Sequence, residues 1–133
     1  MALVVGALLA CAAGLMATVV GLDRDRAFYP TVTIVIASIY ALFAVMGAST
    51  HALVLESLVG LVFLAIAIAG FRSSLWLVVV ALAAHGIFDF AHGRVISNPG
   101  VPLWWPAFCL AYDLTAAAYL AGLLMTRRIR AAA

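Results

Sequence analysis

The fold is decided by residues 30–71, which read PTVTIVIASIYALFAVMGASTHALVLESLVGLVFLAIAIAGF. A single helix over this apolar run would be about 63 Å long at 1.5 Å per residue, whereas the hydrocarbon core of a membrane is about 30 Å thick. The run therefore has to cross a membrane twice. We expect the chain to turn at the mildly polar sequence GAST, residues 47–50.

The composition of the whole chain agrees with a membrane protein. Of its 133 residues, 68% are hydrophobic and 9% are charged, whereas about a quarter of the residues in a soluble domain are charged. A water-soluble fold is therefore excluded, and the length suits one domain over residues 1–133. The arginines form no basic patch interleaved with aromatic residues, so we expect membrane lipids as partners and no nucleic acid.

The sequence on either side of residues 30–71 predicts three further spans. Charged or turn-forming sequences bound them, namely LDRDR at 22–26, RSS at 72–74 and NPG at 98–100. We expect an all-α, polytopic bundle of five transmembrane helices over about residues 2–21, 30–48, 51–71, 74–92 and 105–126. Small residues recur along the first span, which is typical of close helix packing. They are Gly6, Ala10, Ala13, Gly14, Ala17 and Gly21.

The arginines predict the orientation of this bundle, because cytoplasmic loops carry an excess of positive charge. With the C-terminus in the cytoplasm and the N-terminus outside, all arginines except Arg94 fall on the cytoplasmic side. These are Arg24, Arg26, Arg72, Arg127, Arg128 and Arg130. Trp104 and Trp105 then open the last span at the outer interface, where tryptophan is favoured. We expect a multi-pass protein of a bacterial cytoplasmic (inner) membrane.

Polar residues gather in the outer half of the predicted bundle. His85, Asp89 and His92 follow an i, i+4, i+7 spacing, which places them within a roughly 60° arc of one helix face. Counting 1.5 Å per residue puts Glu56 about 8 Å and Asp113 about 12 Å below the outer ends of their spans. Ionisable residues at membrane depth are costly and mark functional sites. We expect these five residues to form a polar pocket that is open towards the outer side.

One use of such a pocket is a metal site. Histidine with carboxylate suits zinc or non-haem iron. His85, Asp89 and His92 could bind a divalent metal from one helix, with Glu56 or Asp113 completing the set. A metal-bound water could then act as a nucleophile near neutral pH, as in a hydrolase. No other cofactor is indicated.

Two other uses stay open. In metal-free acid–base chemistry, one of Glu56 and Asp113 would act as a neutral acid and the other as a base held by histidine, which suits an isomerase or cyclase. The catalytic candidates are then His85, Asp89, Asp113 and Glu56. A proton- or ion-coupled transporter or channel subunit is the third use, and either reading allows a homo-oligomer. Whether the protein is an enzyme is left open by the sequence.

The expected substrate is a small apolar or lipid-like molecule, because it would reach the pocket from the membrane. Trp104, Trp105 and Phe108 could line its entrance. Tyr112 is a fourth candidate for contact with the substrate, although a tyrosine here also suits an anchor of the helix at the membrane interface. The loop over residues 94–102 could cover the pocket.

The sequence HGIFDFAH at residues 85–92, followed by WPAFC at 105–109 and by Asp113, resembles an uncharacterised family of small bacterial integral membrane proteins. The resemblance covers roughly the last third of the chain. It implies a shared polar core and carries no activity. The zinc-protease pattern H-E-x-x-H and a glycine-rich phosphate loop are both missing from the sequence.

Overall fold

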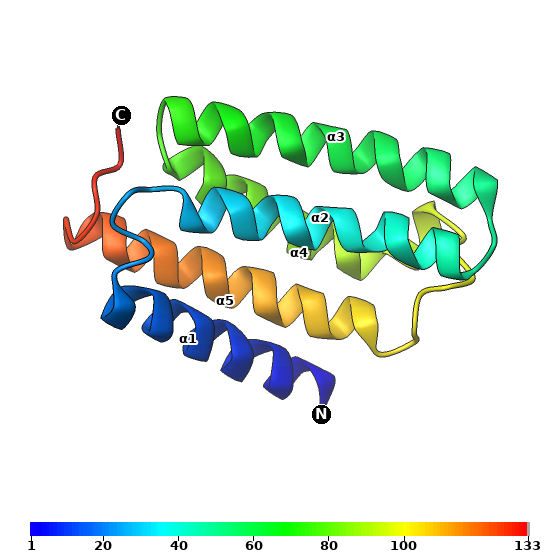
Figure 1. Ribbon diagram of the computed structural model, residues 1–133. Helices are drawn as coiled ribbons and strands as arrows, with labels where there is room; N and C mark the ends of the chain where they lie inside the picture. Colours follow the sequence, from blue (N-terminus) through cyan, green and yellow to red (C-terminus); the bar gives the residue numbers. More distant parts are fainter. Residues whose placement is uncertain (133) are drawn as a thin grey trace.

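Residues 1–132 are described in a computed structural model (Figure 1). Their helices are α1 (Ala2–Val20), α2 (Phe28–Met46), α3 (Thr50–Arg72), α4 (Trp76–Val95) and α5 (Trp105–Met125). The described part of the chain contains no strand, only an isolated backbone bridge between Ser74 and Ala132. Residue 133, the last of the expected domain, lies outside the described residues.

All five helices are long and apolar enough to cross a membrane, so the expected number and type of spans are confirmed. With 19–23 residues each, they extend about 28–35 Å. The bounds shift slightly from those expected. α4 runs on past Gly93 to Val95, because Ile96 N–H still donates to the His92 carbonyl. The expected covering loop, residues 94–102, therefore starts inside α4.

The distribution of side chains is that of a membrane protein, with apolar groups outside and polar groups inside. Large apolar side chains are exposed along the helices, for example Leu8, Val62, Val80 and Phe90. The buried polar or charged side chains of the described chain are Asp23, Thr33, Glu56, His85, Asp89, His92 and Asp113. Exposed apolar surface on this scale needs a lipid environment, so the structure supports a multi-pass membrane protein.

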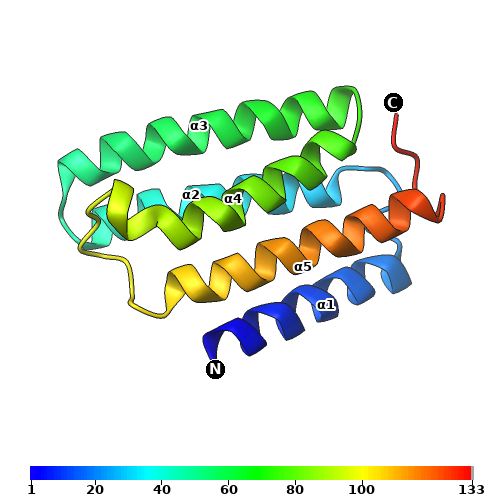
Figure 2. The same cartoon turned by 180° about the vertical axis from the view of Figure 1, so that it is seen from behind.

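The helices pack in an order that differs from their order along the chain. α1 lies beside α5, α5 beside α4, α4 beside α3, and α3 beside α2, which also touches α4 (Figures 1 and 2). α1 and α2, although consecutive, are not packed closely together. This order brings α3, α4 and α5, which carry the ionisable residues, together in the interior.

The small residues of α1 form its contact with α5, as the sequence predicts. Gly6, Ala10, Gly14 and Ala17 are the buried residues of this helix. A Cβ atom at Gly6 would collide with the carbonyl oxygen of Phe108 on α5. The two backbones can approach this closely only because glycine has no side chain.

The two ends of the bundle carry different elements (Figure 1). The N-terminus, the α2–α3 turn and the α4–α5 loop share one end, which we call the N end. The α1–α2 loop, the α3–α4 turn and the residues after α5 share the other, the C end. Arg94 is near the N end, and the remaining arginines of the chain lie at the C end.

Candidate functional site

The first group of polar side chains joins α4 to α5. His85 and Asp89 stand one turn apart on α4, and Asp113 comes from α5. His85 Nδ1 lies 2.7 Å from Asp113 Oδ2 and 3.3 Å from Asp89 Oδ2. Gly86 permits this approach, since a Cβ there would come within 3.2 Å of Asp113. One ring nitrogen thus faces two carboxylates, and we call these residues the His85–Asp89–Asp113 site.

This site is closed, whereas we expected a pocket open towards the outer side. His85 is 2% exposed, Asp89 1% and Asp113 0%. Aromatic rings from the neighbouring helices cover the imidazole. The Tyr40 ring of α2 lies 6.2 Å from it, and the Phe63 ring of α3 meets it edge-on at 4.8 Å. The sequence placed these residues at similar depth but held no information on which rings would cover them.

Several oxygen atoms in and beside the site lack a hydrogen bond. Within residues 1–132, both carboxylate oxygens of Asp89, Oδ1 of Asp113 and the Tyr40 hydroxyl are buried without a hydrogen-bond partner. Leaving a buried charge uncompensated costs several kcal/mol. The site therefore offers acceptor atoms that a cation or an added proton would satisfy.

The residues present fit a small divalent metal ion. One ligand atom from each of His85, Asp89 and Asp113 can be chosen so that all lie within 4.8 Å of one another. Ligand atoms about 2.0–2.2 Å from a tetrahedral zinc are roughly 3.3–3.6 Å apart. The 3.3 Å distance between His85 and Asp89 already matches, and the distance to Asp113 would have to widen by about 0.6 Å. Both carboxylates keep a second oxygen for a proton or water.

A second group joins α4 to α3 and to the α4–α5 loop. His92 Nε2 lies 2.7 Å from Glu56 Oε1, and both side chains are 2% exposed. The Asn98 amide donates to the same Glu56 oxygen at 2.9 Å and to the Tyr40 carbonyl at 3.0 Å. We call this the His92–Glu56 pair. It ties the loop to the bundle.

The structure divides the residues that we expected to share a metal ion, which were His85, Asp89 and His92 together with Glu56 or Asp113. His85 and Asp89 meet Asp113, whereas His92 and Glu56 meet each other. Seven residues of α-helix separate the two histidines by about 10 Å along the axis. Spacing on one helix face predicted the common face correctly, but it could not assign partners from α3 and α5.

Two residues of this region were not among the candidates. Tyr40 stacks on His92 with ring centroids 4.1 Å apart and lies beside His85, so it stands between the two groups. The position of this tyrosine in the middle of an apolar span was the feature of the sequence that could have identified it. Asn98 was interpreted only as a turn residue, and nothing in its sequence context indicated a bond to Glu56.

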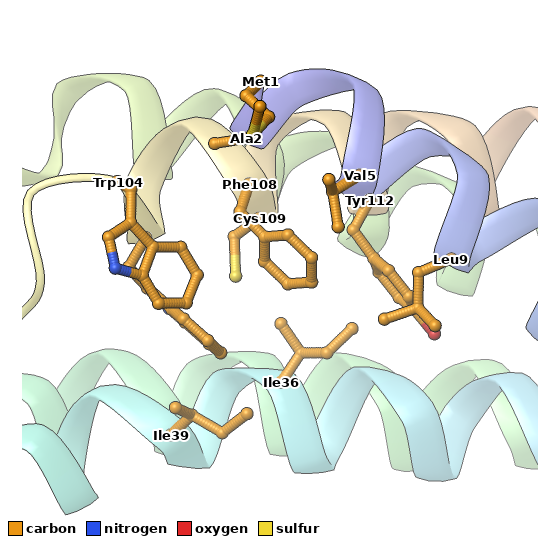
Figure 3. Close-up of a pocket in the computed structure, with 11 residues that line it drawn as sticks. Met1, Ala2, Val5, Leu9, Ile36, Ile39, Trp104, Phe108, Cys109 and Tyr112 are labelled. Carbon is orange, nitrogen blue, oxygen red and sulfur yellow. The ribbon is translucent and has the colours of Figure 1, made fainter.

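An apolar groove of about 670 Å³ lies beside α5. Figure 3 shows that it lies between α1 and α2, with α5 behind. Its lining includes Trp104, Trp105, Phe108 and Tyr112, all four of the expected substrate contacts. From α1 and α2 it includes Ala2, Val5, Leu9, Ile36 and Ile39, and Met1 precedes them.

Cys109 connects this groove to the His85–Asp89–Asp113 site. It lines the groove, yet it is only 3% exposed. It stands one turn before Asp113 on α5. Cys109 thus belongs to the lining of the groove and to the helix that carries Asp113.

Comparison of this chain with protein-family models, with curated protein sequences and with solved structures gives no match.

Proposed function

We propose that this is a multi-pass protein of the bacterial cytoplasmic membrane, with its N-terminus outside. The clustering of arginines at the C end supports this orientation, because positively charged loops stay in the cytoplasm. The N end carries Trp104 and Trp105 at the start of α5, and tryptophan suits a membrane interface. Both ionisable groups then lie in the outer half of the bilayer.

Within that frame, the proposed function is binding and chemical alteration of a small apolar or lipid-like molecule at a metal-dependent site. The carrying observation is the His85–Asp89–Asp113 site, whose ligand atoms converge while the Asp89 oxygens have no hydrogen-bond partner among the described residues. Zinc and iron(II) both accept imidazole and carboxylate ligands. The adjoining groove would hold the substrate, with Trp105 and Phe108 against it.

The chemistry divides between the metal and the side chains. A bound divalent metal would polarise the substrate or activate a water molecule. The second oxygen of Asp89 or Asp113 is placed to accept a proton. His85 would hold the metal through Nδ1, the atom that lies nearest to both carboxylates. Cys109 lines the groove one turn before Asp113, so a substrate in the groove would approach the carboxylates past its side chain.

The test is the metal content of detergent-solubilised protein, purified without chelator and measured by mass spectrometry. We expect about one zinc or iron per chain in the unaltered protein and its loss in Asp89→Asn and Asp113→Asn. Glu56→Gln is the matched control, because it also removes a buried carboxylate but belongs to the other group. Equal metal in all variants, or none in any, would overturn a metal site at these residues.

Metal-free acid–base chemistry on the same substrate class is the second candidate. It is favoured by the direct 2.7 Å contact between His85 and Asp113, since a general base works through a hydrogen bond of this length to a partner that orients it. Metal-free protein that converts a substrate, and loses turnover in Asp113→Asn with its helical content intact, would select this candidate over the first.

A further inference from the structure

The His92–Glu56 pair has no role in the metal-dependent chemistry proposed above. His92 Nε2 and Glu56 Oε1 are 2.7 Å apart, and the Asn98 amide donates a second hydrogen bond to the same Glu56 oxygen. A proton can pass between a nitrogen and an oxygen at this distance. Ionisable groups inside a membrane commonly serve proton movement.

A polar cavity leads to this pair from the N end of the bundle. It has a volume of about 250 Å³ and is lined by His92, Asn98 and Ser97, among others. A cavity needs about 10–15 Å³ of accessible volume and two or more polar partners to hold a water molecule. Water can therefore reach His92 here. Because Nε2 is engaged by Glu56, Nδ1 is the ring nitrogen left for that water.

Glu56 borders a second hollow on its other side. This crevice of about 290 Å³ lies between α2 and α3, and its lining includes Ser38, Ser57 and Gly60 together with Glu56. Its lining is mostly apolar, unlike that of the first cavity. Glu56 thus stands between a water-accessible cavity and a crevice on the membrane side.

We infer that the His92–Glu56 pair is a proton-exchange site that connects water in the polar cavity with the Glu56 carboxyl group. A hydronium ion in the cavity gives a proton to Nδ1 of His92, and Nε2 of the same ring releases its proton to Oε1 of Glu56. The imidazole ends neutral, the carboxylate becomes a carboxylic acid, and a neutral water molecule remains in the cavity. The reverse path restores the starting tautomer.

The surroundings of His92 restrict the route. Glu56 faces it from α3, the Tyr40 ring stacks on it from α2 at 4.1 Å, and Asn98 approaches from the loop. On α4 itself, Asp89 lies almost one turn earlier and belongs to the other site. Glu56 is therefore the acceptor in contact with the ring, and the Tyr40 stack holds the ring plane towards it.

The test is infrared spectroscopy of the protein in phosphatidylcholine vesicles during a pH titration and after transfer into heavy water. Glu56→Gln should remove one carboxylic-acid band, which assigns it, whereas Asp25→Asn in the exposed α1–α2 loop should leave it. In the unaltered protein this band should shift promptly in heavy water. We expect His92→Phe to slow that exchange by about a hundredfold, the usual effect of removing a proton-transfer group.

A second variant keeps the test decisive if His92→Phe fails to fold. Ser97→Trp would fill the polar cavity while leaving the pair itself unchanged, so it too should slow the exchange. The inference would be overturned if the Glu56 band changed neither with pH nor in heavy water. It would also be overturned if hydrogen–deuterium exchange were as fast in both variants as in the unaltered protein. Neither result depends on metal at the His85–Asp89–Asp113 site.

Discussion

At the scale of single residues, Glu56 and Asp113 each have a histidine as a close partner, whereas Asp89 shares the histidine of Asp113. Asp113 contacts His85 and Glu56 contacts His92, each at 2.7 Å. Asp89 Oδ2 lies 3.3 Å from His85 Nδ1, the nitrogen that already contacts Asp113. A second negative charge at one imidazole is unfavourable without a further cation or proton. Asp89 is thus the residue that most strongly indicates a missing positive partner.

Two neighbouring valines of α1 allow a test of whether the groove binds an apolar molecule. Val5 lines the groove, whereas Val4 is 62% exposed and does not line it. Val5→Trp should fill part of the groove and lower the amount of apolar molecule that co-purifies with the protein. Val4→Trp adds the same side chain to the lipid-facing surface and should leave that amount unchanged. Mass spectrometry of organic extracts measures both, and equal retention in the two variants would argue against an occupied groove.

At the scale of elements, α1 is held by its contact with α5. This dependence makes the small residues on its inner face important for stability, because a larger residue would push the two backbones apart. The groove has α1 as one wall, so the docking of α1 also sets the width of the groove. The α4–α5 loop is fixed differently, through Asn98 and through Gly100, where a Cβ would collide with the Phe43 carbonyl.

Gly6→Ala tests the docking of α1. The added Cβ has no room against Phe108, and such overpacking costs about 1–3 kcal/mol. Gly122→Ala is the control, since a Cβ there meets nothing within 4 Å. Replacing this helical glycine by alanine should stabilise the protein by about 0.5–1 kcal/mol. Denaturation in detergent should therefore show a lower free energy of unfolding for Gly6→Ala and a higher one for Gly122→Ala. A Gly6→Ala protein as stable as the unaltered one would show that α1 can shift without penalty.

At the scale of the whole molecule, five spans place the two termini on opposite sides of the membrane. We predict that a cysteine added after the described C-terminal residues is protected from a membrane-impermeant thiol reagent in intact cells. A cysteine replacing the exposed Ser97 in the α4–α5 loop should react. A Cys11→Ser, Cys109→Ser background removes the native thiols. The reverse labelling pattern would place the C-terminus outside and both ionisable groups in the inner half.

The sequence alone determined the class of fold, and it predicts the depth of the polar residues in the membrane. An apolar run of 42 residues cannot be one span, and helix rise converts residue number into depth. The common face of His85, Asp89 and His92 also follows from the sequence, because 3.6 residues make one turn. The small inner face of α1 was predicted on the same basis.

Only the tertiary structure decided which polar residues meet. The rotation of each helix about its axis depends on packing against its neighbours, so sequence could not assign Asp113 to His85 or Glu56 to His92. The same packing closed the site beneath Tyr40 and Phe63 and left the groove between α1 and α2. The depth of a residue depends only on its own helix, whereas the choice of its hydrogen-bond partner depends on how α3, α4 and α5 pack against one another.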